Sequence, residues 1–408
     1  MPNINLTNAK KTKSDEFYTQ FQDIQKEIEA YLDYNPNTFR DQIVYCNCDD
    51  PYESNFFRYF VLNFNKLGLK KLITTSYKPS PIANTQISLF GDDKTLVVEK
   101  GRPKVTANKF VINEVHDTDG DGEFNLKDIA KKLKENKNNE WTPLEKDGDF
   151  RSDECVELLK QSNIVVTNPP FSLFREYLRQ LVDYDKKFLI IGNINAITYK
   201  EIFPLIKENK IWLGNGMGRW ISGFIVPKSY ELYGTEARID ESGNRIIATN
   251  SCLWLTNLDH GRRHQPLPLM TMSDNLKYSK HKEIKGKESY DHYDNYNAIE
   301  VPFTDAIPSD YEGVMGVPIT FLDKYSPDQF KIIGMAQRSC HVELPDTKKY
   351  GDYIQMKGDR SVEGSNGRKI DEAPIVKGRV DGKTYYVDKN GREVTSLYMR
   401  IFIKHNKK

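Results

Sequence analysis

Apolar and polar positions alternate along the first 200 residues in a way that predicts helices and strands in turn. Apolar side chains recur at helical spacing through residues 20–32, and the largely apolar run at residues 42–48 indicates a strand. An aromatic helix over residues 56–67, closed by Gly68, and a second strand over residues 71–77 follow. A strand, a polar turn, a helix and a strand form the first unit of a doubly wound α/β sheet.

The alternation continues to about residue 191 and then gives way to β-rich segments. The next expected elements are a helix at 155–159, a strand at 163–167, a helix at 173–182 and a strand at 187–191. Later apolar runs, punctuated by glycine, predict strands at 211–213, 223–226 and 248–255, and Lys389-Asn390-Gly391 predicts a hairpin turn. We therefore expect an α/β first half and a β-rich second half.

The strand at 163–167 ends in the stiff turn Asn168-Pro169-Pro170-Phe171, where neither proline can donate a backbone hydrogen bond. The side-chain carbonyl of Asn168 and the main-chain carbonyl of Pro169 can together accept both hydrogens of an exocyclic amine. The ring of Phe171 can stack on the same planar base, so the turn suits a flipped adenine. An Asn cap beside a core phenylalanine explains the same four residues equally well.

Acidic residues follow the first strand and recur later beside an aromatic one. Asp49 and Asp50 are expected at the carboxyl end of the first strand, next to the N-terminus of the following helix. There the two acids could bind an amine or a ribose of a ligand, while the backbone amides of the helix bind a ligand carboxylate. A helix N-cap with a spare surface acid is the alternative, and no GxGxxG motif is present. Gly148-Asp149-Phe150 offers an acceptor for an adenine amine or a ribose hydroxyl beside an apolar wall, although it is by itself an ordinary turn.

Residues 117–128 carry acids at the spacing of a calcium-binding loop. Asp128 replaces the usual bidentate glutamate, and a strand rather than a helix is expected before the loop, so a solvated acidic loop is favoured and no metal site is predicted. The residues concerned are Asp117, Asp119, Asp121, Glu123 and Asp128.

From residue 260 onward, basic and aromatic side chains are interleaved with little periodicity. Such a stretch can track phosphates and stack on bases, or it can form a solvated surface loop. The basic residues chosen as candidate phosphate contacts are Arg262, Arg263, Lys277, Lys280 and Lys282, and the neighbouring aromatic residues are Tyr278, Tyr290, Tyr293 and Tyr296.

Composition excludes some classes of protein. The 59 Lys and Arg residues balance 58 Asp and Glu residues, so any basic surface has to be local. A 38% apolar content with a mean hydropathy of −0.65, no apolar run of membrane-spanning length and no signal-peptide core predict a cytoplasmic protein without a membrane partner. Five scattered cysteines fit neither a disulfide framework nor a four-ligand zinc site.

Taken in order, these motifs resemble those of adenine-specific DNA methyltransferases, most closely the EcoRI-type family. The resemblance covers nearly the whole chain and includes the segments CDDPYESNFFRYF, VVTNPPFSLFREYL and GVPITFLDKYSPDQFKIIG. The motifs are Glu16-Phe17-Tyr18-Thr19, Asp49-Asp50-Pro51 with Ser54, Gly148-Asp149-Phe150 and Asn168-Pro169-Pro170-Phe171.

The resemblance implies a Rossmann-like, S-adenosylmethionine-dependent methyltransferase domain at residues 1–210. It also implies a β-rich target-recognition and DNA-binding region at residues 211–408, part of which completes the catalytic sheet. The implied reaction moves a methyl group from S-adenosylmethionine to the N6 amine of a flipped adenine in duplex DNA. The implied context is a restriction-modification system, whose cognate endonuclease forms no stable complex with this chain.

The family's residue roles carry over by position. Phe17, Tyr18 and Thr19 would help to close the S-adenosylmethionine pocket, and Asp149 and Phe150 would meet the adenosine. Asp49, Asp50, Pro51 and Ser54 would contact the methionine end, although this chain lacks the glycines that other methyltransferases have there. Asn168, Pro169, Pro170 and Phe171 would hold the target adenine.

Two other functions stay open at this point. A methyltransferase acting on RNA or on a protein glutamine can use the same Asn-Pro-Pro turn, because both substrates offer a planar amine to the same two acceptors. A DNA-binding module that kept the sheet without catalysis is the second alternative. The intact Asn168 argues against it, since a scaffold alone would not need that side chain.

Overall fold

A computed structural model gives the fold, and its contacts divide the chain into two compact units. The first unit is Met1–Ala196 with Ile211–Gly261, and the second is Ile197–Lys210 with Arg262–Lys408. The structure describes residues 18–48, 54–77, 107–116, 138–217, 221–226, 232, 237–241, 243–247, 251–336, 348–358 and 360–406.

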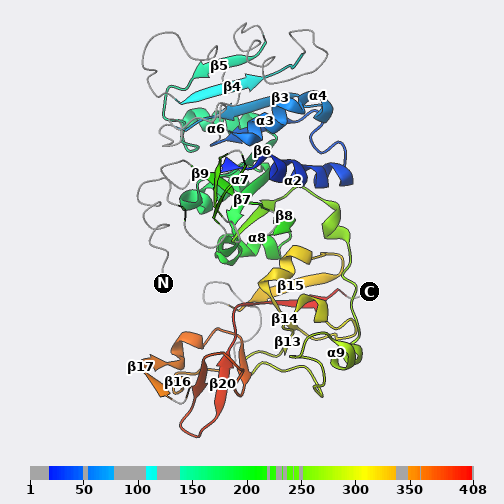
Figure 1. Ribbon diagram of the computed structural model, residues 1–408, viewed down its shortest axis with the longest axis vertical. Coiled ribbons are helices and arrows are strands. Elements are labelled where there is room, and N and C mark those ends of the chain that lie inside the picture. The colour runs from blue at the N-terminus through cyan, green and yellow to red at the C-terminus, as the bar shows by residue number, and fades with distance from the viewer. Residues whose placement is uncertain are drawn as a thin grey trace. The chain divides into compact units, whose positions relative to one another are not determined.

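The first unit is built on an eight-stranded mixed sheet in the order β5-β4-β3-β2-β6-β7-β12-β8 (Figure 1). The four central strands, β3, β2, β6 and β7, are parallel, and each flanking strand is antiparallel to its neighbour. The strands are β2 (Ile43–Asn47), β3 (Lys71–Thr75), β4 (Asn108–Ile112), β5 (Glu140–Pro143), β6 (Ile164–Thr167), β7 (Lys187–Asn193), β8 (Trp212–Met217) and β12 (Cys252–Thr256).

The chain reverses its direction of winding at β2. It runs from β2 to β3 on one side and later returns to β6 on the other side, so β2 and β6 are neighbouring parallel strands. Val44 pairs with Ile164 and Tyr45 with Val165, which brings the two carboxyl ends together. In α/β sheets, ligands bind at such a topological switch point.

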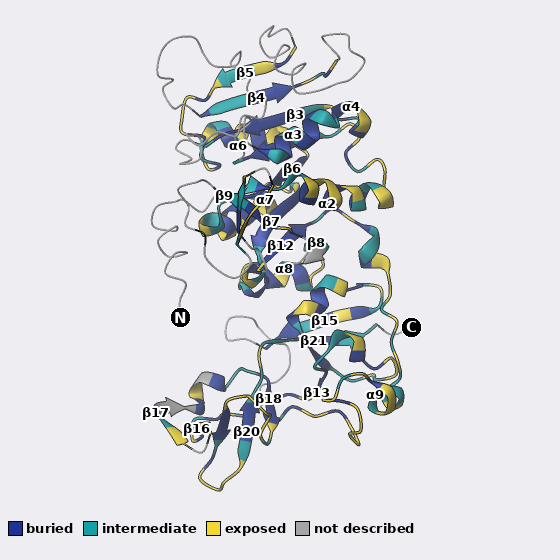
Figure 2. Ribbon diagram, in the orientation of Figure 1, coloured by how far each residue is buried: buried dark blue, intermediate teal, exposed yellow. Residues whose placement is uncertain are grey.

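Helices cover both faces of the central strands. Val44 and Val166 join the apolar cluster of α2 and α3, whereas Tyr45, which points to the opposite face, lies beside Cys155 of α6. Because both faces are covered, all four residues of β6 are buried (Figure 2). In the described part of this unit the helices are α2 (Phe21–Tyr34), α3 (Asn55–Leu62), α4 (Phe64–Leu67), α6 (Asp153–Gln161) and α7 (Phe174–Asp183).

A small four-stranded sheet, in the order β1-β9-β11-β10, completes the first unit. Thr19 of β1 pairs with Phe224 of β9, which joins the start of the chain to a segment more than 200 residues later. The strands are β1 (Tyr18–Thr19), β9 (Phe224–Val226), β10 (Arg238–Ile239) and β11 (Arg245–Ile247).

The second unit contains two further sheets and two short helices. One sheet has the order β13-β14-β21-β15 and the other β17-β16-β19-β20-β18. The elements are α8 (Phe203–Lys207), α9 (Met272–Tyr278), β13 (Ile299–Glu300), β14 (Met315–Pro318), β15 (Phe330–Met335), β16 (Ile354–Lys357), β17 (Arg360–Asn366), β18 (Ile375–Lys377), β19 (Tyr385–Val387), β20 (Glu393–Ser396) and β21 (Arg400–His405). The 3-10 helices among the described residues are Phe171–Leu173, Ile194–Thr198, Gly261–His264, Thr304–Ala306, Ile319–Lys324 and Gly367–Ile370.

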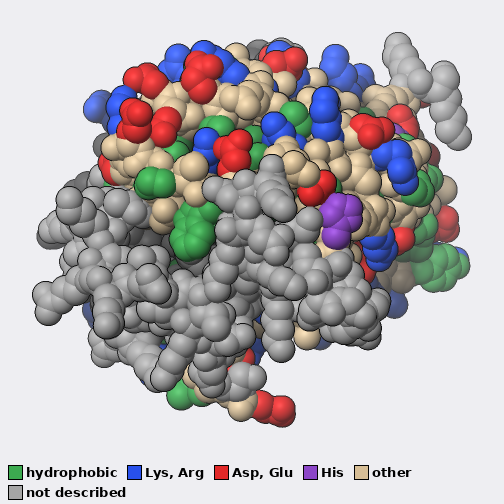
Figure 3. Space-filling model, turned by 90° about the horizontal axis from the view of Figure 1, so that it is seen from above, with side chains coloured by type: hydrophobic (Ala, Val, Ile, Leu, Met, Phe, Trp, Pro, Cys, Tyr) green, Lys and Arg blue, Asp and Glu red, His purple; other side chains and the backbone are tan. Residues whose placement is uncertain are grey.

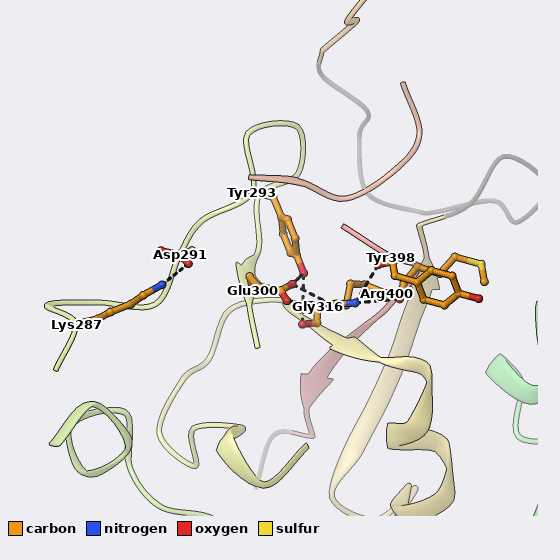
Figure 4. Close-up of polar contacts among 8 residues, drawn as sticks. Lys287, Asp291, Tyr293, Glu300, Gly316, Tyr398 and Arg400 are labelled. Atoms are coloured by element: carbon orange, nitrogen blue, oxygen red, sulfur yellow. Dashed lines mark hydrogen bonds and ion pairs between the residues drawn. The ribbon is translucent and has the colours of Figure 1, made fainter. Parts of the chain in front are cut away.

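A buried charge cluster holds the first of these sheets together. Arg400 donates to both carboxylate oxygens of Glu300, at 2.6 and 3.1 Å, and the Tyr293 hydroxyl donates to the same carboxylate (Figure 4). A Cβ on Gly316 would lie 2.1 Å from the Tyr293 hydroxyl oxygen, so glycine is needed there. Burial raises the pKa of Tyr293 well above its ordinary value, which keeps the phenol a hydrogen-bond donor.

Most elements expected from the sequence are confirmed, with two differences. The helix expected over residues 56–67 is divided at Asn63, whose side chain and backbone amide both donate to the carbonyl of Tyr59. Tyr290, Tyr293 and Tyr296 are only 4–6% exposed, so the expectation that they are available for stacking is wrong. Their hydroxyls donate to the Ala306 carbonyl, the Glu300 carboxylate and the Glu372 carbonyl, respectively, which makes them core residues. Among the described helices, none is long and apolar enough to cross a bilayer.

Candidate active site

The Asn-Pro-Pro-Phe turn leaves the carboxyl end of β6, at the switch point of the sheet. Asn168 is 9% exposed and Phe171 is half-buried, with its ring centroid 6.2 Å from that of Phe224. The amide of Leu173 donates to the Pro170 carbonyl at 3.0 Å, which starts the short helix after the turn. The ring contact with Phe224 and the hydrogen bond to the Pro170 carbonyl therefore both hold the turn in place.

Strand β1 brings the first motif to the same place. The side-chain amide of Asn55 donates to the Thr19 carbonyl at 2.8 Å, and Thr19 pairs with Phe224 in the small sheet. Because Phe224 also contacts Phe171, three segments that are far apart in sequence meet around one aromatic pair. The structure thus joins Tyr18 and Thr19 to the start of α3 and to the proline turn.

Ser54, expected at the cofactor, has a structural task that the sequence did not assign. It is 1% exposed and caps α3, where its hydroxyl oxygen accepts from the amides of Phe56 and Phe57 at 3.1 and 3.2 Å. Its role as a cofactor contact stays a prediction.

Gly148-Asp149-Phe150 lies against the end of β3. Gly148 has a φ of +77°, and a Cβ there would come within 2.0 Å of the Ser76 carbonyl oxygen. The Asp149 carboxylate accepts from the Arg151 side chain at 2.5 and 2.8 Å, and these bonds raise the pKa of Arg151 above its ordinary value. Arg151 also contacts Glu176 of α7 at 3.2 Å, so Asp149 is held in place by a charged partner.

Helix α7 ties the motifs to one another. The ring of Phe150, which is 3% exposed, packs edge-on against Tyr177 with 5.0 Å between centroids, and Gln180 donates to the Phe150 carbonyl at 3.1 Å. The Tyr177 hydroxyl donates in turn to the side-chain oxygen of Asn47, at the end of β2. Neither Tyr177 nor Asn47 was identified from the sequence. The one available signal was a polar Asn within the apolar run of residues 42–48.

Several expected residues lie outside the part of the chain that the structure describes. They are Phe17, Asp49, Asp50 and Pro51 of the expected cofactor site and Asp117, Asp119, Asp121, Glu123 and Asp128 of the calcium-loop pattern. Their roles stay predictions.

The basic residues selected from the sequence differ sharply in exposure. Arg263 is 7% exposed and donates to Asn209, while Arg262 forms a 2.6 Å ion pair with Asp323. Burial raises the pKa of Asp323, and the Arg262 charge partly offsets that effect. Lys277, Lys280 and Lys282 are exposed. The lysines are therefore better placed for solvent-side contacts than the two arginines.

No single charge sign dominates the face shown in Figure 3, where basic and acidic side chains are interspersed among the described residues. This mixture agrees with the near balance of 59 basic and 58 acidic residues. An anionic partner would thus have to be recognised by a local group of cations elsewhere.

Comparison with known proteins identifies the family. The model of a family described as adenine-specific methyltransferase EcoRI matches residues 5–406. The type II methyltransferase M.EcoRI of Escherichia coli is 52% identical over 330 residues, 80% of this chain and 88% of that protein. The type II methyltransferase M.MpnI of Mycoplasma pneumoniae is 34% identical over 361 residues, 86% of this chain and 94% of that protein. No solved structure matches. The chain therefore belongs to the EcoRI family of adenine-specific methyltransferases.

Proposed function

We propose that this protein is a DNA (adenine-N6) methyltransferase that uses S-adenosylmethionine to modify a flipped adenine in duplex DNA. The observation that carries the proposal is the position of Asn168-Pro169-Pro170-Phe171 at the carboxyl end of β6, beside the end of β2. Relatives named type II methyltransferases support a role as the modification component of a restriction-modification system. Such a role implies a cytoplasmic enzyme and a cognate endonuclease.

The finer architecture follows from the same reasoning. Four parallel strands in the order β3-β2-β6-β7, extended by antiparallel β12, support a Rossmann-like methyltransferase sheet. Residues 1–210, completed by β8 and β12, would form the catalytic domain. The β-rich remainder up to residue 408 would recognise the target sequence.

The residues around the switch point suit the methyl donor chemically. Asp149 keeps its carboxylate at the surface of a turn, 16% exposed, where it can accept from a ribose hydroxyl or an adenine amine. Thr19 of β1 lies beside the start of α3, which follows the acidic segment of residues 49–53 in the sequence. S-adenosylmethionine would supply an electrophilic methyl group on a sulfonium. Thr19, Ser54, Asp149 and Phe150 would hold it.

Asn168 and Phe171 would handle the target base. The N6 amine of adenine is a poor nucleophile because its lone pair is delocalised into the ring. Hydrogen bonds from that amine to the Asn168 side chain and to the Pro169 carbonyl would favour a tetrahedral nitrogen and aim its lone pair. The Phe171 ring, fixed by Phe224, would stack on the base and offset part of the few kcal/mol that extrusion from the duplex costs.

Exposed cations of the second unit would contact the DNA backbone. Lys277, Lys280 and Lys282 lie on or after α9, and Tyr278 beside them is 59% exposed. Lysines at the surface contribute salt-dependent, sequence-independent binding, and an exposed ring can stack on an unpaired base.

The test is transfer of labelled methyl from S-adenosylmethionine to unmethylated duplex DNA, followed by nucleoside analysis. Label in N6-methyladenine would support the proposal. Label in RNA or in protein glutamine would show that the substrate is not duplex DNA and would contradict the proposal. Binding of the methyl donor and of DNA, without transfer to any of a wide set of duplexes, would favour a DNA-binding module.

Asn168→Ala is the decisive variant, and Asn163→Ala is its matched control. Both residues flank β6, but the side-chain oxygen of Asn163 accepts from the Ile43 amide at 2.9 Å, at the end of the strand away from the proline turn. Asn168→Ala should keep its fold and its affinity for S-adenosylmethionine and lose about 10²–10³-fold or more in transfer rate. Asn163→Ala should retain transfer. An active Asn168→Ala would overturn the assignment.

A further inference from the structure

Asn47 is a buried polar residue at the end of an otherwise apolar strand. It closes β2 and is 1% exposed. Its side chain points to the sheet face covered by α7, because Tyr177 of that helix contacts it. Cys48, which follows, has a φ of +63°, so the backbone turns sharply just before the acidic segment expected at the cofactor.

The two oxygens of Asn47 bind the flanks of the proline turn. Its backbone carbonyl accepts from the Thr167 hydroxyl, and its side-chain oxygen accepts from the Tyr177 hydroxyl. Thr167 immediately precedes Asn168, and Tyr177 lies on the helix that follows Phe171. Both partners are fully buried, so the two bonds are shielded from water.

The side-chain nitrogen of Asn47 is buried and has no acceptor among the described residues. A buried donor without a partner lowers stability, so its presence calls for an explanation, and a bound ligand that accepts from it is one. The unused donor belongs to the last residue of β2, at the carboxyl end of the strand, where a ligand with oxygen or nitrogen acceptors is expected.

We propose that Asn47 is a positioning residue that couples binding of the methyl donor to the geometry of the adenine-binding turn. Its amide nitrogen is available to an acceptor atom of the methyl donor, and its two oxygens hold Thr167 and Tyr177. Tyr177 also packs on Phe150, so the same bridge reaches the Gly148-Asp149-Phe150 segment. The inference rests on the proposed function, because it concerns how the methyl donor and the adenine-binding turn of the proposed site affect each other.

Coupling of this kind is measured as a change in one ligand's affinity caused by the other. Calorimetry gives the affinity for S-adenosylhomocysteine, the inert product form of the cofactor, with and without duplex DNA. A duplex with 2-aminopurine at the target adenine reports base extrusion by fluorescence. In the wild type we expect each ligand to tighten the other by the same factor, within the usual range of about 5–150-fold.

Asn47→Asp and Tyr177→Phe test whether the hydrogen bonds of Asn47 are needed for coupling as well as for folding. Asn47→Asp keeps the side-chain size and the oxygen that accepts from Tyr177, and while ionised it offers no donor in place of the amide nitrogen. Tyr177→Phe removes only the hydroxyl. Tyr45→Phe is the matched control, because the Tyr45 hydroxyl is also fully buried and bonds Thr75 at 2.9 Å within the sheet. We expect the coupling factor to fall toward one in both test variants and to persist in Tyr45→Phe.

Folding and function can be told apart in the same experiments. If Asn47→Asp does not fold, Tyr177→Phe, with a melting temperature matched to that of Tyr45→Phe, decides the question. A folded Tyr177→Phe that retains the full coupling factor and extrusion signal would overturn the inference. A wild type that binds neither the product nor DNA would instead refute the proposed function.

Discussion

Gly148 lies so close to Ser76 that a Cβ on the glycine would come within 2.0 Å of the Ser76 carbonyl oxygen. The contact presses the Gly148-Asp149-Phe150 segment against the end of β3. Sequence spacing alone indicates only a turn at these residues. The close approach explains why the turn must begin with glycine.

Gly148→Ala should therefore lower both stability and donor affinity. Its φ of +77° disfavours alanine by about 1 kcal/mol, and the backbone contact adds a further loss. Gly378→Ala is the matched control, because Gly378 has the same φ of +77° but nothing within 4 Å of an added Cβ. Urea unfolding should show a clearly larger loss for Gly148→Ala. Equal losses would mean that the Ser76 contact is easily relieved.

Ser54→Ala tests whether the α3 cap also contacts the methyl donor. Loss of the cap should cost about 1 kcal/mol of unfolding free energy. Ser152→Ala removes a similar cap, from α6, whose hydroxyl accepts from the Cys155 amide. If Ser54 contacts the donor, calorimetry will show weaker S-adenosylhomocysteine binding in Ser54→Ala alone. Unchanged affinity in both variants would leave Ser54 with the capping role only.

Arg262→Ala and Lys277→Ala should separate stability from DNA binding. Removing Arg262 leaves the largely buried Asp323 carboxylate without its 2.6 Å partner, so the melting temperature should fall. Lys277 is exposed, and its removal should leave the melting temperature unchanged. If it contacts a phosphate, the slope of log affinity against log salt should shrink by about 0.9. An unchanged slope would remove Lys277 from the interface.

Asp23 should make the stability of the folded state depend on pH. Its carboxylate accepts from the Ser222 amide and hydroxyl, at 2.9 and 2.8 Å, and burial raises its pKa above the ordinary value of 3.8. The folded chain thus holds this proton more tightly than the unfolded chain. The stability that Asp23 contributes is therefore fully present below pH 3.8 and is lost as the pH rises through the raised value.

Asp23→Asn keeps an oxygen for Ser222 and removes the titration. Relative to the wild type, its free energy of unfolding should increase as the pH rises from 3.8 through the raised pKa of Asp23 and should then level off. Urea unfolding across that range measures the difference, and Asp33→Asn, an exposed position of the same helix, is the control. A constant difference between Asp23→Asn and the wild type would contradict the expectation.

Local patterns predicted the elements well because they depend on near neighbours. The Lys389-Asn390-Gly391 turn joins β19 and β20 as expected, since glycine supplies the positive φ there. Sequence patterns could not show that Arg263 and Tyr293 are buried, because their partners, Asn209 and Glu300, depend on the tertiary fold. A charged or phenolic side chain carries no local sign of a buried partner.

The candidate site was predicted in part for the same reason. Asn168 stands out because two prolines follow it, and Asp149 because glycine and phenylalanine flank it. Asn47 and Tyr177 were missed, since their importance comes from a contact across 130 residues. The capping role of Ser54 was recognisable only once the start of α3 was known.

The lateral order of the main sheet has a consequence for biosynthesis. Strand β12 pairs with β7 along Cys252–Thr256, yet some 60 residues separate the two in the chain. A nascent chain that ends near residue 210 would therefore expose one flank of β7, with backbone amides open to pairing with another chain. Fragments cut at that point should aggregate, whereas fragments that extend past Thr256 carry the strand that protects this flank.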